Sequence, residues 1–197
     1  MKKEEISINA IKTKTVKIII ESIPGSSLIT HRLDPATVEA FTKRETGISK
    51  KKEFRDYDKE YQSCFYLTSD KKYGFPASGI MGALLDATVP MDIHKTTIKR
   101  AFRLMGDIYE LKYKKLNRRV DNPRRSGINK TPDVRHRPEF IDWEMELFVL
   151  YDPNQISLDQ IINLINQAGF SSGIGDWRPS SPKSSGTHGM FKVKVTK

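Results

Sequence analysis

The chain has 197 residues, and its 34 lysines and arginines outnumber its 24 aspartates and glutamates, which leaves a formal charge of +10. Hydrophobic residues make up 37% of it and charged residues 29%, a composition that excludes collagen-like and low-complexity chains. No apolar run approaches the roughly 18 residues that cross a bilayer. The first residues do not resemble a signal peptide, and the single cysteine, Cys64, excludes an internal disulfide, so we expect a cytoplasmic protein without a membrane partner.

The N-terminal half predicts a strand, an insertion and two helices. Residues 14–20 are rich in β-branched side chains, as strands are. Residues 30–61 carry mixed charges with weak periodicity and predict a surface insertion. Apolar side chains recur at helical spacing over residues 77–86 and again over 95–105, so each of these segments predicts a helix.

The C-terminal half predicts three strands and a helix. Residues 108–116 and 141–151 alternate apolar and polar side chains, which indicates half-buried strands. A capping box at residues 157–160 predicts the start of a helix that ends near Gly169. Residues 190–195 predict the last strand.

The order of these elements predicts an α+β fold. Two successive units of strand, helix and strand can form a ferredoxin-like sheet of the modified RNA-recognition type, with helices on one face. We expect residues 1–197 to form a single domain with long inserted loops, one at about 30–61 and a basic one at about 117–138.

Positive charge is concentrated between Lys112 and Pro138. This segment holds ten basic and two acidic residues, a surplus of eight that accounts for most of the net charge. Its prolines and its few large apolar residues predict an exposed, partly mobile basic loop. Arginine binds phosphates in bidentate fashion and stacks on bases. The segment therefore favours a polyanion partner, although charge that serves solubility alone gives the same pattern.

A glycine-rich stretch, residues 169–189, precedes the last strand. Its five glycines let the backbone approach a ligand closely and offer N–H donors to phosphates. Trp177 and Arg178 combine a flat apolar face with a cation, as base stacking and phosphate contact require, and Lys183 adds charge. The alternative is an irregular connection in which Trp177 fills the core and Arg178 pairs with a carboxylate.

The predicted helix that begins near Ser78 opens with Phe-Pro-Ala-Ser-Gly-Ile-Met-Gly at residues 75–82. Proline and small residues leave free N–H groups at a helix N-terminus, where the helix dipole attracts phosphate. The alternative is an ordinary helix start whose glycines allow tight packing. The segment lacks both the Gly-Lys-Ser/Thr ending of a P-loop and the glycine pattern of a dinucleotide fold.

The helix start at residues 75–85 resembles that of the backbone subunits of CRISPR effector complexes, members of the RAMP superfamily. The stretch 169–189 is similar to the glycine-rich loop of that superfamily, and the basic residues 118–137 lie between central strands, where those subunits carry their thumb. The resemblance implies a protein that grips single-stranded nucleic acid by its backbone and polymerises along it. The family's lysine before the helix glycine is Met81 in this chain.

A second likeness concerns the run at residues 173–179, followed by Gly-Met-Phe at 189–191. This pattern also looks like a group of uncharacterised bacteriophage proteins. A stand-alone phage relative of the backbone subunits fits both likenesses and would act in the host cytoplasm. The resemblance implies a homo-oligomer or filament, and it is compatible with a host or phage protein complex as a partner.

The four histidines are scattered, and none has metal-ligand spacing to another or to Cys64, so we expect no metal and no cofactor. His31 and His188 are the candidates for a positioned general acid or base. We expect a sequence-independent, non-catalytic binder of single-stranded RNA or DNA. The alternatives are a metal-independent endoribonuclease and a viral protein that binds and modulates a host defence complex.

The residues expected to contact nucleic acid come from the three segments described above. The basic segment contributes Arg118, Arg119, Arg124, Arg125, Lys130, Arg135 and Arg137. The helix start and the glycine-rich stretch contribute Ser78, Gly173, Gly175, Trp177, Arg178 and Lys183.

Overall fold

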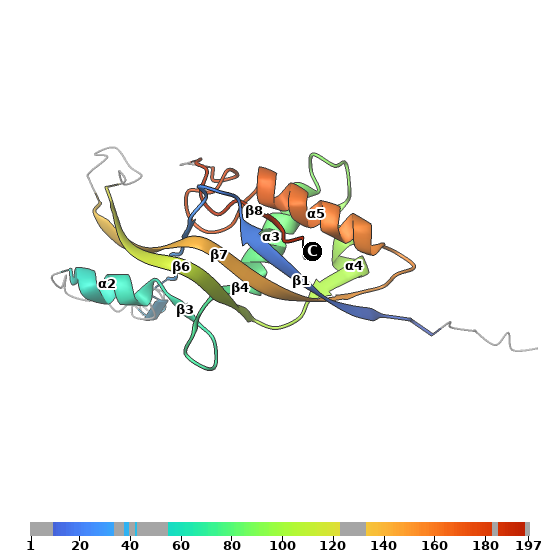
Figure 1. Ribbon diagram of the computed structural model, residues 1–197, viewed down its shortest axis with the longest axis horizontal. Helices are drawn as coiled ribbons and strands as arrows, with labels where there is room; N and C mark the ends of the chain where they lie inside the picture. The colour runs from blue at the N-terminus through green and yellow to red at the C-terminus, as the bar shows by residue number, and fades with distance from the viewer. Residues whose placement is uncertain are drawn as a thin grey trace, which may run out of the picture.

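The computed structural model describes residues 10–33, 38, 39, 42, 55–122, 133–182 and 185–195. These residues form an α+β structure with an open antiparallel sheet (Figure 1). The strands are β1 (Lys14–Ser22), β2 (Leu28–Ile29), β3 (Tyr66–Leu67), β4 (Tyr73–Pro76), β5 (Phe102–Leu104), β6 (Ile108–Asp121), β7 (Arg135–Tyr151) and β8 (Phe191–Val193). The helices are α2 (Tyr57–Ser63), α3 (Ala77–Ala87), α4 (Lys95–Ala101) and α5 (Leu158–Ser171).

The sheet has the strand order β3-β4-β6-β7-β1-β8, and both β2 and β5 pair with β7. In its centre, β6-β7-β1-β8, helix α3 connects β1 to β6 in chain order and helix α5 connects β7 to β8. This arrangement of two strand-helix-strand units is compatible with a ferredoxin-like fold. The predicted fold class is therefore confirmed.

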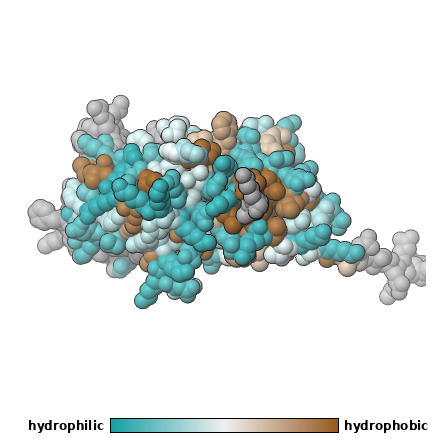
Figure 2. All heavy atoms as spheres, viewed as in Figure 1, coloured by the Kyte–Doolittle hydropathy of each residue, from teal (hydrophilic) through white to brown (hydrophobic). Residues whose placement is uncertain are grey.

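The core lies between β7 and the two long helices. Trp143, Met145 and Leu147 alternate along β7 and are at most 1% exposed. The apolar stripe of α5, which includes Ile161 and Leu164, is buried as well. Helix α5 begins at the predicted capping box. The side chain of Ser157 accepts a hydrogen bond from the backbone N–H of Gln160, and the side chain of Gln160 accepts one from the backbone N–H of Ser157. Hydrophilic residues cover most of the face in Figure 2, and the hydrophobic area seen there gathers near β8.

The opposite face of the sheet carries a ladder of ion pairs. Along β1, β6, β7 and β8 the residues between the buried ones are charged, and lysines lie opposite carboxylates. The pairs on these strands are Lys17–Glu146, Lys112–Glu144, Lys114–Asp142 and Lys192–Glu21. Lys194, directly after β8, also pairs with Glu144, and Lys72, which precedes β4, pairs with Glu110. Because six lysines meet five carboxylates in these pairs, this face holds little of the positive surplus of the chain.

The pleat of β7 changes phase at Asp142, whose φ is +49°. On the C-terminal side of Asp142 the odd-numbered residues from Trp143 onward are buried, whereas on its N-terminal side Phe140 is buried and Ile141 is only half-buried. Phe140 packs edge-on against Tyr113, with ring centroids 5.1 Å apart. The predicted alternation from residue 141 therefore holds from Trp143 onward.

The helix predicted over residues 95–105 ends at Ala101 instead. Phe102 to Leu104 form β5, which pairs with the C-terminal end of β7, so that Phe102 lies opposite Tyr151. The ladder between β6 and β7 stops at Leu111, which leaves that end of β7 without β6 as a partner. The apolar residues of this segment are spaced as in a helix. The segment is nevertheless a strand, because backbone hydrogen bonds to β7 stabilise the strand more than helix propensity stabilises a helix.

Helix α5 does not end at Gly169 but continues to Ser171. Gly169 faces β8 so closely that a Cβ atom there would lie 1.8 Å from the carbonyl oxygen of Phe191. The glycine is therefore explained by the close approach of helix and strand, and not by a helix terminus.

The basic segment is largely a hairpin. Strand β6 continues to Asp121 and β7 begins at Arg135, with Arg119 opposite Arg137, so the predicted loop over 117–138 is wrong at both of its ends. The pairing of β6 with β7 continues through these strand ends, and helix α2 packs against β7. Residues 123–132 lie outside the described residues, as does most of the insertion predicted at 30–61 before α2. None of the described helices is long and apolar enough to cross a membrane.

Candidate nucleic-acid interface

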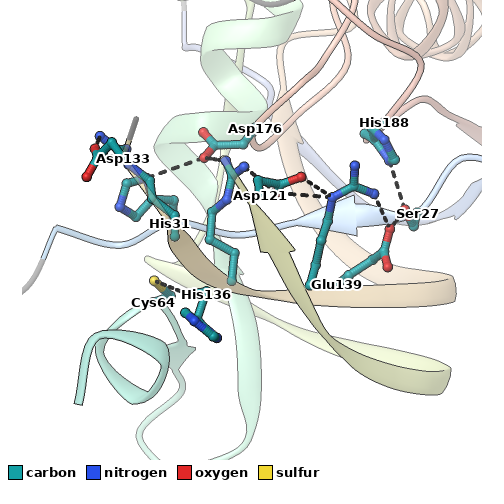
Figure 3. Close-up of polar contacts among 12 residues, drawn as sticks. Ser27, His31, Cys64, Asp121, Asp133, His136, Glu139, Asp176 and His188 are labelled. Atoms are coloured by element: carbon teal, nitrogen blue, oxygen red, sulfur yellow. Dashed lines mark hydrogen bonds and ion pairs between the residues drawn. The ribbon is translucent and has the colours of Figure 1, made fainter. Parts of the chain in front are cut away.

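A continuous chain of polar contacts joins the base of the β6–β7 hairpin to the glycine-rich stretch (Figure 3). In Figure 3 Asp121 lies in the middle, with His31 and Asp176 on one side and Glu139, Ser27 and His188 on the other. The order of contacts is His31, Asp176, Arg137, Asp121, Arg119, Glu139, Ser27 and His188. Both candidate histidines are therefore ends of one network.

Arg137 is the central cation of this network, and its side chain is only 4% exposed. Its Nη1 lies 2.5 Å from Oδ2 of Asp176, and its Nη2 lies 2.5 Å from Oδ2 of Asp121. Its Cζ lies 5.9 Å from the ring centroid of Trp177. A guanidinium can make this many directed contacts at once because it is planar and carries five N–H donors. Arg137 therefore ties the glycine-rich stretch to the hairpin. Both of its terminal nitrogens contact carboxylates, and its Nε is buried without a hydrogen-bond partner among the described residues, so a phosphate cannot reach it.

The other half of the network runs through Arg119. Its Nε lies 2.9 Å from Asp121, and its Nη1 lies 3.1 Å from Oε1 of Glu139. Ser27 donates its hydroxyl hydrogen to the same Glu139 oxygen at 2.8 Å, so Nδ1 of His188, 2.9 Å from the hydroxyl, is the donor to Ser27. Burial and the charge of Arg119 lower the pKa of His188, which favours its neutral form.

Asp176 connects the network to His31, whose Nδ1 lies 3.3 Å from Oδ2 of Asp176. Burial alone would raise the pKa of Asp176, but the hydrogen bond from His31 and the charge of Arg137 outweigh it and hold this pKa below its ordinary value. Asp176 is therefore a carboxylate at neutral pH. An ionised carboxylate beside His31 orients the imidazole ring.

A cavity of about 380 Å³ lies between the start of α3 and the glycine-rich stretch. Six of the residues named in the sequence prediction and in the network line it together: Ser78, Gly173, Gly175, Arg178, His31 and Asp176. Asp86 of α3 lines it as well. Helix α3 has Pro76 as its N-cap, no side-chain cap and no acidic residue in its first turn. The unneutralised N-terminus of α3 therefore contributes a partial positive charge to this cavity.

Arg178 is half-buried in the wall of this cavity, and its partners are neutral. Its Nη1 donates to the carbonyl oxygen of Gly175 at 3.1 Å, and its Nε donates to the hydroxyl of Ser180 at 3.2 Å. Among the residues that the structure describes, no carboxylate forms an ion pair with Arg178. The loop holds this guanidinium in place without neutralising its charge.

The shape of the stretch depends on Gly175 and Trp177. Gly175 has a φ of +76°, and a Cβ there would lie 2.4 Å from the carbonyl oxygen of Ile29 in β2, so the position requires glycine for packing within the chain. Trp177 is half-buried and has a φ of +59°, which is uncommon for a large side chain. It therefore neither fills the core nor stands free in solvent.

The described arginines of the hairpin are paired with acids. Arg118 lies 2.6 Å from Asp58 and its guanidinium covers the ring of Tyr61 at 4.9 Å. Arg135 lies 2.8 Å from Asp133. Arg119 and Arg137 belong to the network. The remaining predicted contacts of the basic segment and the stretch lie outside the described residues: Arg124, Arg125, Lys130 and Lys183.

No known family model matches the chain, and no curated protein is similar to it in sequence. Its fold is similar to that of a chain in the cryo-EM structure of the type III-B Cmr-β complex bound to cognate target RNA, with a TM-score of 0.51. The fold resembles that of a CRISPR effector subunit. The two sequences are 11% identical, and the match covers 93% of this chain and 60% of that one. At this identity the likeness concerns the fold alone, and it agrees with the resemblance to the RAMP superfamily.

Sequence reasoning did not find the partners that complete the site. Ser27, Glu139 and Asp121 are ordinary polar residues in the sequence, and the network joins them to residues that lie far away in the chain. His31 was singled out as a candidate, but its pairing with Asp176 follows only from the fold. No spacing or composition signal marks these pairs.

Proposed function

We propose that the protein binds single-stranded RNA without sequence preference and without cleaving it, as a RAMP-type protein that assembles side by side along the strand. The backbone phosphate occupies the cavity between α3 and the glycine-rich stretch. There the guanidinium of Arg178, the hydroxyl of Ser78 and the N–H groups of Ser78 and Gly79 are available to it, whereas the N–H of Ala77 donates to the carbonyl oxygen of Asp107. The observation that carries this proposal is the uncompensated charge of Arg178 beside the acid-free start of α3.

The likeness of fold supports RNA as the ligand. The similar chain belongs to a Cmr-β complex that is bound to target RNA. The match covers 93% of this chain and 60% of that one. DNA of the same length is the natural comparison in any binding experiment.

The hairpin has two roles in this proposal. Arg119 and Arg137 hold the glycine-rich stretch against the sheet through their ion pairs with Asp121, Asp176 and Glu139. Because these pairs already neutralise their charges, the two arginines do not contact the RNA. The positive surplus of the segment that extends beyond Asp121 attracts the polyanion over a longer range.

A metal-independent endoribonuclease is the second candidate, and the pairing of His31 with Asp176 is the observation that favours it. Asp176 orients the ring through Nδ1, which leaves Nε2 to act on a substrate hydroxyl. Tyr66 lines the same cavity, and burial raises the pKa of its phenol, which therefore remains a proton donor. In this alternative His31 acts as the base and Tyr66 as the acid.

The experiment that tests the proposal starts from the purified protein. We expect a polynucleotide to copurify, to raise the ratio of absorbance at 260 and 280 nm, and to disappear on digestion with RNase but not DNase. Protein that comes free of nucleic acid and does not bind added single-stranded RNA at low salt contradicts the proposal. Labelled RNA incubated with EDTA should remain intact, and cleavage that His31→Ala abolishes would favour the endoribonuclease.

A further inference from the structure

A second cavity, of about 320 Å³, lies between α2 and the N-terminal part of β7. His31 lines this cavity as well as the one beside α3, so the two cavities share this residue in their linings. The second cavity is rich in cations: its lining includes Arg32, Arg55, Arg135, His136 and Arg137. Two of these residues, Arg135 and Arg137, were expected to contact nucleic acid.

The charges of this second cavity are not all neutralised. Arg55 forms ion pairs with Glu60 and Asp133, and Arg135 also pairs with Asp133. Arg32, in contrast, is exposed, and among the residues that the structure describes no acidic side chain pairs with it. Arg32 thus resembles Arg178 in the first cavity, because each is the arginine whose charge no described carboxylate cancels.

The second cavity also has groups that suit a nucleobase. His136 lines it and packs against Tyr57, with ring centroids 4.9 Å apart. Tyr57 supports the His136 ring from outside the lining, and the guanidinium of Arg55 lies 5.4 Å from the centroid of the Tyr57 ring. Burial raises the pKa of Cys64 to about 11, so its thiol stays neutral and does not repel an anion. Aromatic rings beside an arginine are the usual platform for single-stranded bases.

We propose that the second cavity is a second nucleotide site, in which Arg32 holds a phosphate and His136 stacks on a base of the same RNA strand that occupies the first cavity. The strand then crosses His31 on its way from one cavity to the other. This inference rests on the proposed function, because it continues the same strand. A single ligand at two joined sites gains affinity through effective concentration.

The test compares a short oligouridylate that fills one cavity with a long one that spans both, by fluorescence anisotropy at low salt. Arg178→Gln should weaken both oligonucleotides. Arg32→Gln should leave the short one unchanged and weaken the long one about three- to tenfold, the effect of losing one charged phosphate contact. His136→Leu should act in the same way as Arg32→Gln. The matched control is Arg100→Gln, which removes one exposed arginine from α4, at the other end of the sheet from α2 (Figure 1), and should change neither affinity.

The outcomes separate the two proposals. Wild-type protein that binds neither oligonucleotide contradicts the proposed function itself. Wild-type protein that binds both, together with an Arg32→Gln variant that binds the long one as tightly as the wild type does, overturns the second site and leaves the first intact. An equal loss for short and long oligonucleotides in Arg32→Gln also overturns the second site, because Arg32 then belongs to the first. Circular dichroism of each variant verifies the fold.

Discussion

Arg137 in strand β7 and Asp176 in the glycine-rich stretch form an ion pair of 2.5 Å, although they are far apart in the chain. The guanidinium is almost fully buried, whereas the carboxylate is 34% exposed. The second pair of the same guanidinium, with Asp121, fixes it to the end of β6. The two ion pairs of Arg137 therefore hold this wall of the cavity together with the backbone hydrogen bond from Asp176 to Ile29.

Arg137→Met should destabilise the protein strongly. The variant leaves Asp121 and Asp176 without their shared cation, and removing one partner of a buried pair costs about 3–5 kcal/mol. We expect a lower urea midpoint with an unchanged slope, and partial recovery when Asp121→Asn is added. Arg118→Gln is the control, because its exposed pair should contribute at most about 1 kcal/mol. Equal midpoints for wild type and Arg137→Met would contradict the network.

Ser78→Asp should change stability and RNA binding in opposite directions. An acid in the first turn of α3 stabilises the helix by about 0.3–1 kcal/mol, since that turn has no acid of its own. The same charge repels a phosphate in the adjoining cavity. Thermal melts and anisotropy titrations measure the two effects, with Ser78→Ala as the control that removes only the hydroxyl. A variant that binds RNA as well as the wild type would show that phosphate does not occupy this cavity.

Two helical glycines should respond oppositely to alanine. Nothing lies within 4 Å of a Cβ at Gly82, so Gly82→Ala should stabilise α3 by about 0.5–1 kcal/mol. A Cβ at Gly169 would meet the Phe191 carbonyl oxygen at 1.8 Å, so Gly169→Ala must push α5 away from β8. We expect a higher melting temperature for the first variant and a clearly lower one for the second. The close packing of α5 on β8 is refuted if Gly169→Ala melts at the wild-type temperature.

The stability of the protein should fall as the pH drops below about 6.5, the ordinary pKa of histidine. His188 has a lowered pKa in the folded state, so the unfolded chain binds a proton more readily and acid favours unfolding. Asp176 and Glu139 also have lowered pKa values, which predicts a further loss at more acidic pH, where they become protonated. Urea unfolding at a series of pH values measures both steps. His188→Gln should remove the first step alone, and an unchanged pH profile in this variant would speak against the role of His188.

The sequence predicted the elements whose side-chain periodicity reflects burial. The alternation from Trp143 onward and the capping box of α5 hold because each is a local pattern that the fold leaves undisturbed. Strand β5 was missed because Phe102 has helical spacing to its neighbours, and only the free end of β7 makes it a strand. The hairpin ends were missed because their charged strands lack an apolar alternation.

The candidate site was predictable in its parts but not in its connections. Ser78, Gly175 and Arg178 were named from local composition, and all three line one cavity. The arginines of the hairpin were all treated alike, since the sequence does not reveal which of them meets a carboxylate. Arg137 forms ion pairs with two carboxylates, whereas Arg178 forms none with any described carboxylate. This difference arises only when the chain folds.

The dependence of single-stranded RNA affinity on salt, measured for the wild type and for Arg178→Gln, tests the central claim most directly. We predict that the wild-type affinity falls steeply as salt rises, and that Arg178→Gln binds more weakly with a slope shallower by about 0.7, the share of one phosphate contact on a single strand. An affinity that does not change with salt, or an Arg178→Gln variant that follows the wild-type line, would contradict phosphate binding by Arg178.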